Sequence, residues 1–470
     1  MDSPPRPAVG IVYFPALEPL LDAGRDLIDT LEVEPQQYWI RHGHGYRLDE
    51  AAFDRIAGFP QQKLVHGVGL PVGGSVGLDA AQIEPFLESV QRLDPPWVSE
   101  HLAFLRARSA DQVFNTGFLL PPLQSPETVA TAAASLRRLQ ALVGRPLAFE
   151  NPANYLRPLP GELADGEFLA SVCLQSGCGM LLDLHNLWCN ERNGRQSMHD
   201  ALAQVPLDRV WEVHLAGGDS RDGYWLDAHS GLVPEPLMAF CEALFPRLPG
   251  LRAVTFEIMP EYLRAKSIGI DALLRQLESI RALCHRSPGA GHRPAQAPAV
   301  VVQPGLPTLP PQAEWERALA LAVNRRPPQD PLQEALAADP GVAVLQQLVS
   351  NVRAGMLVDL LTLSYRMLVL HLGDAATHGL MERYWAAHLP EPFAGREAQR
   401  FAGFLRGQSL PVPHLEDVLA YELASIEAVA HGHDVRVDLG CDPVALVGAL
   451  RAGRHPGVLP EGRYELTVQP

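Results

Sequence analysis

Residues 179–186 read GMLLDLHN, a short apolar run that ends in a cluster of polar side chains. An apolar run of this length with polar boundaries is typical of a strand that is buried on both faces. The run ends on Asp183, His185 and Asn186, which are residue types that commonly bind metal ions. A buried strand that carries such residues at its C-terminal end is typical of α/β proteins with a parallel sheet.

Seven further runs of the same kind occur on both sides of this stretch. Helical patterns separate them, for example at 79–93, 126–143, 162–176 and 235–245. Strands that alternate with helices predict an α/β fold, here a (β/α)₈ TIM barrel that forms a catalytic, metal-binding domain over residues 1–284. The eight predicted strands are 8–14, 30–35, 63–70, 97–104, 146–151, 179–186, 209–217 and 253–259.

Metal-binding residue types stand at or near the C-terminal ends of the third to eighth predicted strands. In a parallel barrel these ends meet at one mouth. A single such residue is more often a helix cap or a turn residue, but a set in phase with six consecutive strands predicts a metal centre. The predicted ligands are His66, His101, Glu150, Asp183, Asn186, His214, Asp227, His229 and Glu257.

This ligand set is larger than one ion can use, so it predicts a cluster. Several buried carboxylates at one mouth repel each other, and cations would offset that cost. Imidazole with carboxylate suits iron, manganese or zinc, and the ligand types alone leave these open. We expect Glu150 to bridge two ions, and Glu150, Asp183 and His214 to be the catalytic residues.

The composition limits the classes of function. The formal net charge is −16, and an acidic chain repels nucleic acid, so we expect no nucleic-acid partner. The six cysteines form no CxxC pair, which favours reduced thiols. No signal peptide and no long apolar run are apparent, so the expected location is cytoplasmic and no membrane partner is expected.

Residues 285–312 are rich in proline and contain no acidic residue, so they are predicted to form a linker. The linker divides the chain into the barrel and a smaller domain over residues 313–470. Strand-like runs occur near the end of this second domain, and the resemblance described below implies that the rest is mainly helical, so the domain is expected to be of the α+β type.

The barrel part, from about residue 8 to 284, resembles the multinuclear non-heme iron-dependent oxidative enzymes. This family includes the barrel subunit that makes the oxazolone and thioamide groups of methanobactin. The resemblance rests on HGVGLPVGG, SEHLAF, FENPANY, LLDLHNLWCNERNG, EVHLAGG, DAHSG and FEIMPEYL, which occur in family order.

The resemblance implies two or three irons in mixed Fe(II)/Fe(III) states, dioxygen as co-substrate, and oxidation of cysteine in a ribosomally made precursor peptide. It assigns the same nine residues as ligands. This chain departs from the family at Gln36 and Gln37, where many relatives have a Glu-Asn pair, and at His185, which is either an added ligand or turned away from the metals.

The C-terminal part resembles the helical partner proteins that are usually encoded beside these oxidases. The segments that carry this resemblance include NVRAGMLVDLLTLSYRMLVLHLGD and PHLEDVLAYELASIEA, at 351–374 and 413–428. The implied role is to capture the precursor peptide, so that the fused domain replaces a separate partner protein. The tail runs HDVRVDLG and GRYELTVQP either offer a strand edge to the peptide or form a plain hairpin.

Two alternatives stay open from the residues alone. Metal-dependent sugar isomerases and hydrolases are also barrels with His, Glu and Asp clusters. A scaffold that binds metal and peptide without catalysis would carry the same ligands.

Overall fold

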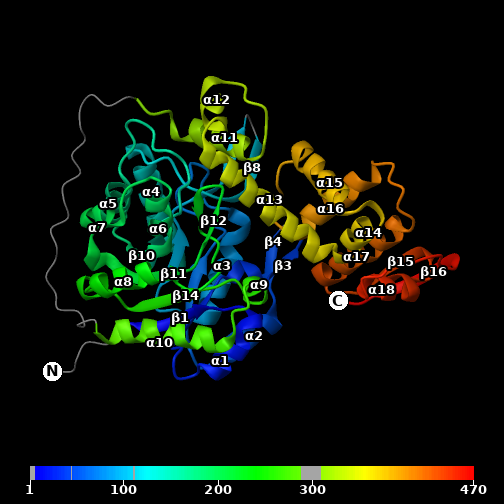
Figure 1. The fold of residues 1–470 in the computed structure, drawn as a ribbon, viewed down its shortest axis with the longest axis horizontal. Helices are drawn as coiled ribbons and strands as arrows, with labels where there is room; N and C mark the ends of the chain where they lie inside the picture. Colours follow the sequence, from blue (N-terminus) through cyan, green and yellow to red (C-terminus); the bar gives the residue numbers. More distant parts are fainter. Residues whose placement is uncertain (1–5, 44, 110–111, 287–307) are drawn as a thin grey trace.

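The computed structural model describes residues 6–43, 45–109, 112–286 and 308–470. Its first half is a closed barrel of eight parallel strands that follow one another around the barrel in chain order (Figure 1). All eight predicted strands are confirmed. They are β1 (Ala8–Val12), β2 (Thr30–Val33), β5 (Gln62–Gly67), β6 (Val98–His101), β9 (Leu147–Glu150), β10 (Gly179–Asp183), β11 (Val210–Ala216) and β14 (Ala253–Glu257).

Helices connect these strands and cover the outside of the barrel. Local signals bound them: Asp79 accepts the N–H of Ala81 at the start of α3, and α4 begins with Ser125 and Pro126 and ends at the left-handed Gly144. The barrel helices are α1 (Glu18–Ala23), α2 (Glu50–Gly58), α3 (Ala80–Leu93), α4 (Pro126–Val143), α5 (Asp165–Ser176), α6 (Leu184–Arg192), α7 (Met198–Gln204), α8 (Glu235–Leu244), α9 (Pro260–Ala265) and α10 (Ile270–Arg286).

Short elements extend the loops at the mouth. Three hairpins occur, β3 (Trp39–His42) with β4 (Gly45–Leu48), β7 (Phe104–Ser109) with β8 (Gln112–Leu120), and β12 (Asp219–Arg221) with β13 (Tyr224–Leu226). The 3₁₀ turns Pro15–Leu17 and Pro35–Tyr38 follow β1 and β2 at the mouth, whereas Leu207–Arg209 and Phe245–Arg247 precede β11 and β14 at the opposite end of the barrel.

Apolar burial explains the barrel. Every residue of β10 and of β14 is buried, as expected for parallel strands that are covered on both faces. Hydrophobic side chains of the strands and of the surrounding helices form one core. The barrel therefore holds the strand ends at fixed positions around one mouth.

Residues 308–470 form the C-terminal unit. Its elements are α11 (Gln312–Val323), α12 (Pro331–Ala337), α13 (Pro340–Leu360), α14 (Thr362–Leu372), α15 (Asp374–Ala387), α16 (Ala394–Arg406), α17 (Leu415–His431), β15 (Val435–Cys441), α18 (Pro443–Arg451) and β16 (Glu461–Val468). The predicted linker 285–312 falls mostly on residues 287–307, outside the described residues.

The first helices of the C-terminal unit share a hydrophobic core with the barrel mouth. Trp315 of α11 and Val349 of α13 belong to the same core as Phe104 and Leu120 of the β7–β8 hairpin. Polar contacts join the same surfaces, since Ser75 N donates to Glu316 Oε1 at 2.9 Å. The helix α13 then continues away from the barrel, and its residue Leu357 enters the separate core of the C-terminal unit (Figure 1).

A second contact joins the two parts at another hairpin of the mouth. The ring of Tyr46 in β4 lies 4.1 Å from that of Phe393, which precedes α16. Because the C-terminal unit touches two hairpins of the mouth, it forms a roof over the C-terminal ends of the strands. The domain boundary at residue 313 stays a prediction.

Among the described residues, no helix on its own has the length and apolar character needed to cross a membrane. By length and composition only, α13 and α14 pass together as a pair bent by 103°.

Candidate metal centre

The strand register brings the predicted ligands together at the mouth. His101 of β6 pairs with Glu150 of β9, and Asp183 of β10 pairs with His214 of β11. Neighbouring residues in a parallel register project to the same side. Seven of the nine predicted residues fall into four groups whose ligand atoms lie within 4.8 Å of one another. These groups are His66–His101–Glu150, Glu150–Asp183–His214, Asp183–His229–Glu257 and Glu32–His214–Glu257.

Two of the histidines face Glu150 from neighbouring strands. His66 Nε2 lies 3.0 Å and His101 Nε2 lies 3.2 Å from Glu150 Oε2. On its other side, His101 Nδ1 donates to Gly67 O at 3.0 Å, which leaves Nε2 as the nitrogen that faces the site. Hydrogen bonds of this kind fix ring orientation and tautomer in metal sites.

His214 is also oriented by a hydrogen bond, which it makes on the side of the ring that faces away from the mouth. Its Nε2 donates to Glu32 Oε2 at 3.0 Å, and both side chains are fully buried. Its Nδ1 therefore faces the mouth, where it lies 3.2 Å from Glu257 Oε1. A carboxylate behind a histidine in this arrangement is common in metalloproteins, because it makes the ring a better ligand.

Several buried atoms at the mouth make no well-formed hydrogen bond among the described residues, although some lie within ion-pair distance of a neighbouring ligand atom. A buried polar atom without a partner costs free energy, so such atoms normally have one. Here the unpartnered atoms converge on one place and are all potential metal ligands. They are Glu32 Oε1, Glu150 Oε2, Asp183 Oδ2, Asn186 Oδ1, His214 Nδ1, His229 Nε2 and Glu257 Oε2.

The electrostatics of the site also favour cations. Burial, and then the carboxylates of Asp227, Glu150 and Glu257, raise the pKa of Asp183 well above its usual range. Burial opposes a charge on His101, yet Glu150 and Glu100 raise its pKa to about 10. The site therefore attracts positive charge, and its imidazole and carboxylate donors fit first-row metal ions. Glu150, Asp183, His214 and Glu257 each belong to two of the four groups, so the groups form one connected set of ligand atoms.

Asp227 and His229 enter the site from the loop after β13. His229 Nε2 lies 2.9 Å from Asp227 Oδ1 and 3.4 Å from Glu257 Oε2. The Tyr155 hydroxyl accepts the backbone N–H of Asp227 at 3.0 Å. These contacts place the loop residues beside the residues that come from the strands.

The structure explains the position of His185. Its Nδ1 donates to Asp227 Oδ1 at 3.0 Å, and its Nε2 accepts the indole N–H of Trp225 at 3.1 Å. Because both nitrogens are engaged, His185 orients Asp227 and has no free nitrogen for a metal ion. Asn193 holds Trp225 in turn, through hydrogen bonds of 2.8 and 2.9 Å to its backbone.

Sequence reasoning missed the acidic residues of β2 and β11. Glu32 contacts His214, as described above, and Glu34 lines the cavity at the mouth, where burial raises its pKa. Glu212 lies beneath them and accepts the Trp97 N–H at 2.8 Å. The alternation in LEVE, which places Glu32 and Glu34 on the same side of the strand, was the available signal.

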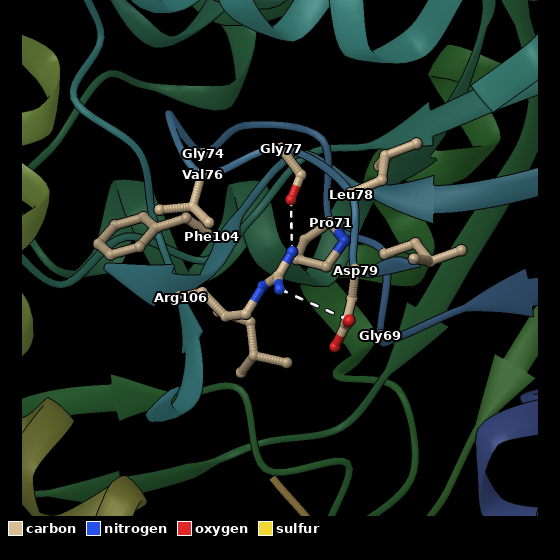
Figure 2. A pocket seen from close by; sticks show the side chains of 11 residues that line it. Gly69, Pro71, Gly74, Val76, Gly77, Leu78, Asp79, Phe104 and Arg106 are labelled. Atoms are coloured by element: carbon tan, nitrogen blue, oxygen red, sulfur yellow. Dashed lines mark hydrogen bonds and ion pairs between the residues drawn. The ribbon is translucent and has the colours of Figure 1, made fainter. Parts of the chain in front are cut away.

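The glycine-rich segment that begins with the last residue of β5 packs closely against its neighbours and has no room for a phosphate. A Cβ on Gly67 would come within 2.3 Å of Glu100 Oε2, and one on Gly73 within 3.0 Å of Ala103 O. Figure 2 shows Arg106 reaching across the loop to Gly77 O and Asp79, beside a hollow of about 10 Å³. Such a volume holds about one water molecule.

A cavity of about 480 Å³ opens onto the candidate ligands. Its floor includes His66, His101 and Glu150, and its roof includes Val352, Met356 and Pro392 of the C-terminal unit. This volume lies within the range of about 300–1,000 Å³ that is typical of ligand pockets. Both halves of the chain therefore shape the space in front of the metal centre.

Curated relatives match the barrel part of the chain. An uncharacterised "UPF0276 protein" of Caulobacter vibrioides is 31% identical over 271 residues, which cover 57% of this chain and 90% of the relative. A protein of the same name from Streptomyces avermitilis is 33% identical over 201 residues, which cover 42% of this chain and 41% of the relative.

Among solved structures, a D-allulose 3-epimerase from Methylomonas sp. is 15% identical with a TM-score of 0.40, and covers 60% of this chain and all of that one. A likeness this weak carries no argument about activity. The profile of one protein family, described as "RiPP precursor modification enzyme MbnB/TglH/ChrH", matches residues 8–268. RiPPs are ribosomally synthesised and post-translationally modified peptides, and the chain belongs to this family of RiPP precursor modification enzymes.

Proposed function

We propose that the chain uses iron and dioxygen to oxidise a cysteine of a ribosomally made precursor peptide. The observation that carries this proposal is the convergence of unpartnered carboxylate, amide and imidazole atoms on a cavity of peptide-binding size. Membership of a RiPP modification family supports a peptide as the substrate. Bound iron would supply the one-electron chemistry that reactions of dioxygen require.

The nine predicted residues are the proposed ligands. Glu150 is the proposed bridge between two ions, because it belongs to two groups of ligand atoms and is approached by His66 and His101 on one carboxylate oxygen. The negative charges of Glu150, Asp183, Asp227 and Glu257 are the charges that two or three cations would balance. In this proposal Glu150, Asp183 and His214 are catalytic residues, because together they form the one group that shares a residue with each of the other three.

The protein's own residues would also exclude water and align the substrate. The roof combines apolar Val352, Met356 and Pro392 with the charged residues Arg353 and Glu391, and a peptide that covers its apolar part would displace water from the metal centre. The floor carries the ligands. A cysteine side chain that enters between roof and floor would meet the ligand-bearing side of the cavity.

The C-terminal unit is the proposed peptide-binding part. Its strands β15 and β16 form a two-stranded antiparallel sheet, and an extended peptide could add to an edge of such a sheet. Because this unit is fused to the barrel, a captured peptide would remain at high effective concentration over the cavity. We propose no nucleic-acid partner, since the chain is strongly acidic.

The experiment is oxygen consumption by the full chain after anaerobic loading with Fe(II). The probe is a short cysteine-bearing precursor peptide encoded beside the gene, and its Cys→Ser variant is the control. The proposal expects oxygen uptake and a mass change with the cysteine peptide only. A His214→Ala variant should bind the peptide without changing its mass. Conversion of a ketose by the same preparation, with no change in the peptide, would replace this proposal with the isomerase alternative.

A further inference from the structure

A second group of potential ligands lies in the C-terminal unit, far from the barrel mouth in sequence. It consists of His414, Asp417 and Cys441. His414 and Asp417 are at the start of α17, and Cys441 is the last residue of β15. Their ligand atoms all lie within 4.8 Å of one another.

The distances within this group match those of a tetrahedral metal site. His414 Nδ1 lies 3.2 Å from Asp417 Oδ2, and Cys441 Sγ lies 3.5 Å from the same oxygen. With zinc bonds of about 2.0 Å to nitrogen and oxygen and about 2.3 Å to sulfur, the edges of a tetrahedron are about 3.3 Å for N–O and about 3.5 Å for S–O. Two of the three edges, those that meet at Asp417 Oδ2, therefore already have tetrahedral lengths, and His414 Nδ1 and Cys441 Sγ lie within 4.8 Å of each other.

The surroundings hold the group in place. The second oxygen of Asp417, Oδ1, accepts the Gly440 N–H at 2.6 Å, which directs Oδ2 toward His414 and Cys441. Hydrogen bonds to the second oxygen of a ligating carboxylate are common in metal sites. Cys441 is fully buried, while the side chains of His414 and Asp417 are 21% and 17% exposed. The group is thus rigid on the sulfur side and accessible from solvent on the other.

We propose that His414, Asp417 and Cys441 bind one divalent cation of the zinc type, with water at the fourth position. The ligands would be His414 Nδ1, Asp417 Oδ2 and the Cys441 thiolate. Binding would release the thiol proton to solvent. The ion would tie the start of α17 to the end of β15, and so would brace the two-stranded sheet. This site is independent of the iron proposed for the barrel, because thiolate ligation favours zinc over the harder ions.

The test counts metal in the full chain and uses Co(II) as a spectroscopic probe for zinc. We expect one zinc per chain that is absent from Cys441→Ala, and a near-ultraviolet cobalt–thiolate band that is lost in the same variant. Cys241→Ala is the matched control, because Cys241 is an equally buried thiol in the barrel core. It should keep both the zinc and the band.

A second variant keeps the test decisive if Cys441→Ala fails to fold. His414 has a left-handed backbone with φ of 59°, and asparagine tolerates this conformation well. His414→Asn should therefore fold, and should bind zinc at least tenfold more weakly than the wild type. Barrel iron should be unchanged in every variant. Equal zinc content in the wild type and both variants, or a cobalt band that survives in Cys441→Ala, would overturn the proposal.

Discussion

Replacing Glu32 with Gln tests how the protein prepares His214 for a metal ion. Glu32 accepts the Nε2–H of His214 at 3.0 Å within a fully buried pair, so the exchange removes the charge and keeps the shape. Loss of a carboxylate behind a metal-bound histidine typically weakens metal affinity about 10–100-fold, which corresponds to about 1.4–2.7 kcal/mol. Because the amide oxygen of Gln can still accept the hydrogen bond, we expect a loss of about tenfold.

The assay is an anaerobic Fe(II) titration of the full chain against a competing chelator. Glu422→Gln is the matched control, since Glu422 is a buried carboxylate that accepts the N–H groups of Leu363 and Ser364 in the C-terminal unit. It should destabilise that unit and leave iron affinity unchanged. If Glu32→Gln binds iron as tightly as the wild type, or if both variants lose affinity equally, the reasoning about His214 is refuted.

Three further predictions concern the mouth and the contact between the two halves. Tyr155→Phe removes the acceptor of the buried Asp227 N–H, which costs about 1–3 kcal/mol; metal analysis should show reduced occupancy, whereas occupancy equal to the wild type would contradict this role. Trp315→Ala should lower the free energy of unfolding by about 3–5 kcal/mol in urea titrations, because Trp315 fills the core shared with the barrel; a loss below about 1 kcal/mol would argue against that shared core. Burial raises the pKa of Glu316 from its usual 4.5 to about 6, so its stabilising contribution is complete below pH 4.5 and is lost as the pH rises through 6; Glu316→Gln should flatten the stability profile in this window, and an unchanged profile would contradict the assignment.

The barrel could be predicted because its strands are buried on both faces. GMLLD at 179–183 and AVTFE at 253–257 are short apolar runs that end on an acidic residue, and both became barrel strands with that residue at the mouth. Because the C-terminal ends of parallel strands meet at one mouth, most candidate ligands could then be assigned to one region. Their role as ligands stays a prediction until metal is measured.

Other parts of the site could be identified only from the three-dimensional structure. Glu32 and Glu34 belong to an alternating run, LEVE, that is typical of a strand with one exposed face, yet in the closed barrel Glu32 contacts His214 and Glu34 lines the cavity. Whether His185 could bind a metal was open from sequence, because only its contacts with Asp227 and Trp225 show that both nitrogens are engaged.

The residues that form the roof of the cavity could not be predicted from the sequence either. The resemblance to helical partner proteins implies the helices of the C-terminal unit, but it does not say which partner each part of α13 meets. Its first turns join the core at the barrel mouth, and its last turns join the core of the C-terminal unit. The pairing of apolar faces from distant segments depends on the whole fold.

The most direct test of the barrel site is the metal content of the wild type and of His214→Ala, both purified anaerobically from cells supplied with iron, with Mössbauer spectroscopy on the same samples. The proposed function predicts two or three coupled irons per chain in the wild type and a clear loss of iron in His214→Ala. A zinc that is retained in both proteins and lost in Cys441→Ala would belong to the C-terminal unit and would leave this claim intact. If zinc or manganese is the metal that the barrel variant loses, with little iron in the wild type, the iron-dependent oxidase proposal is contradicted.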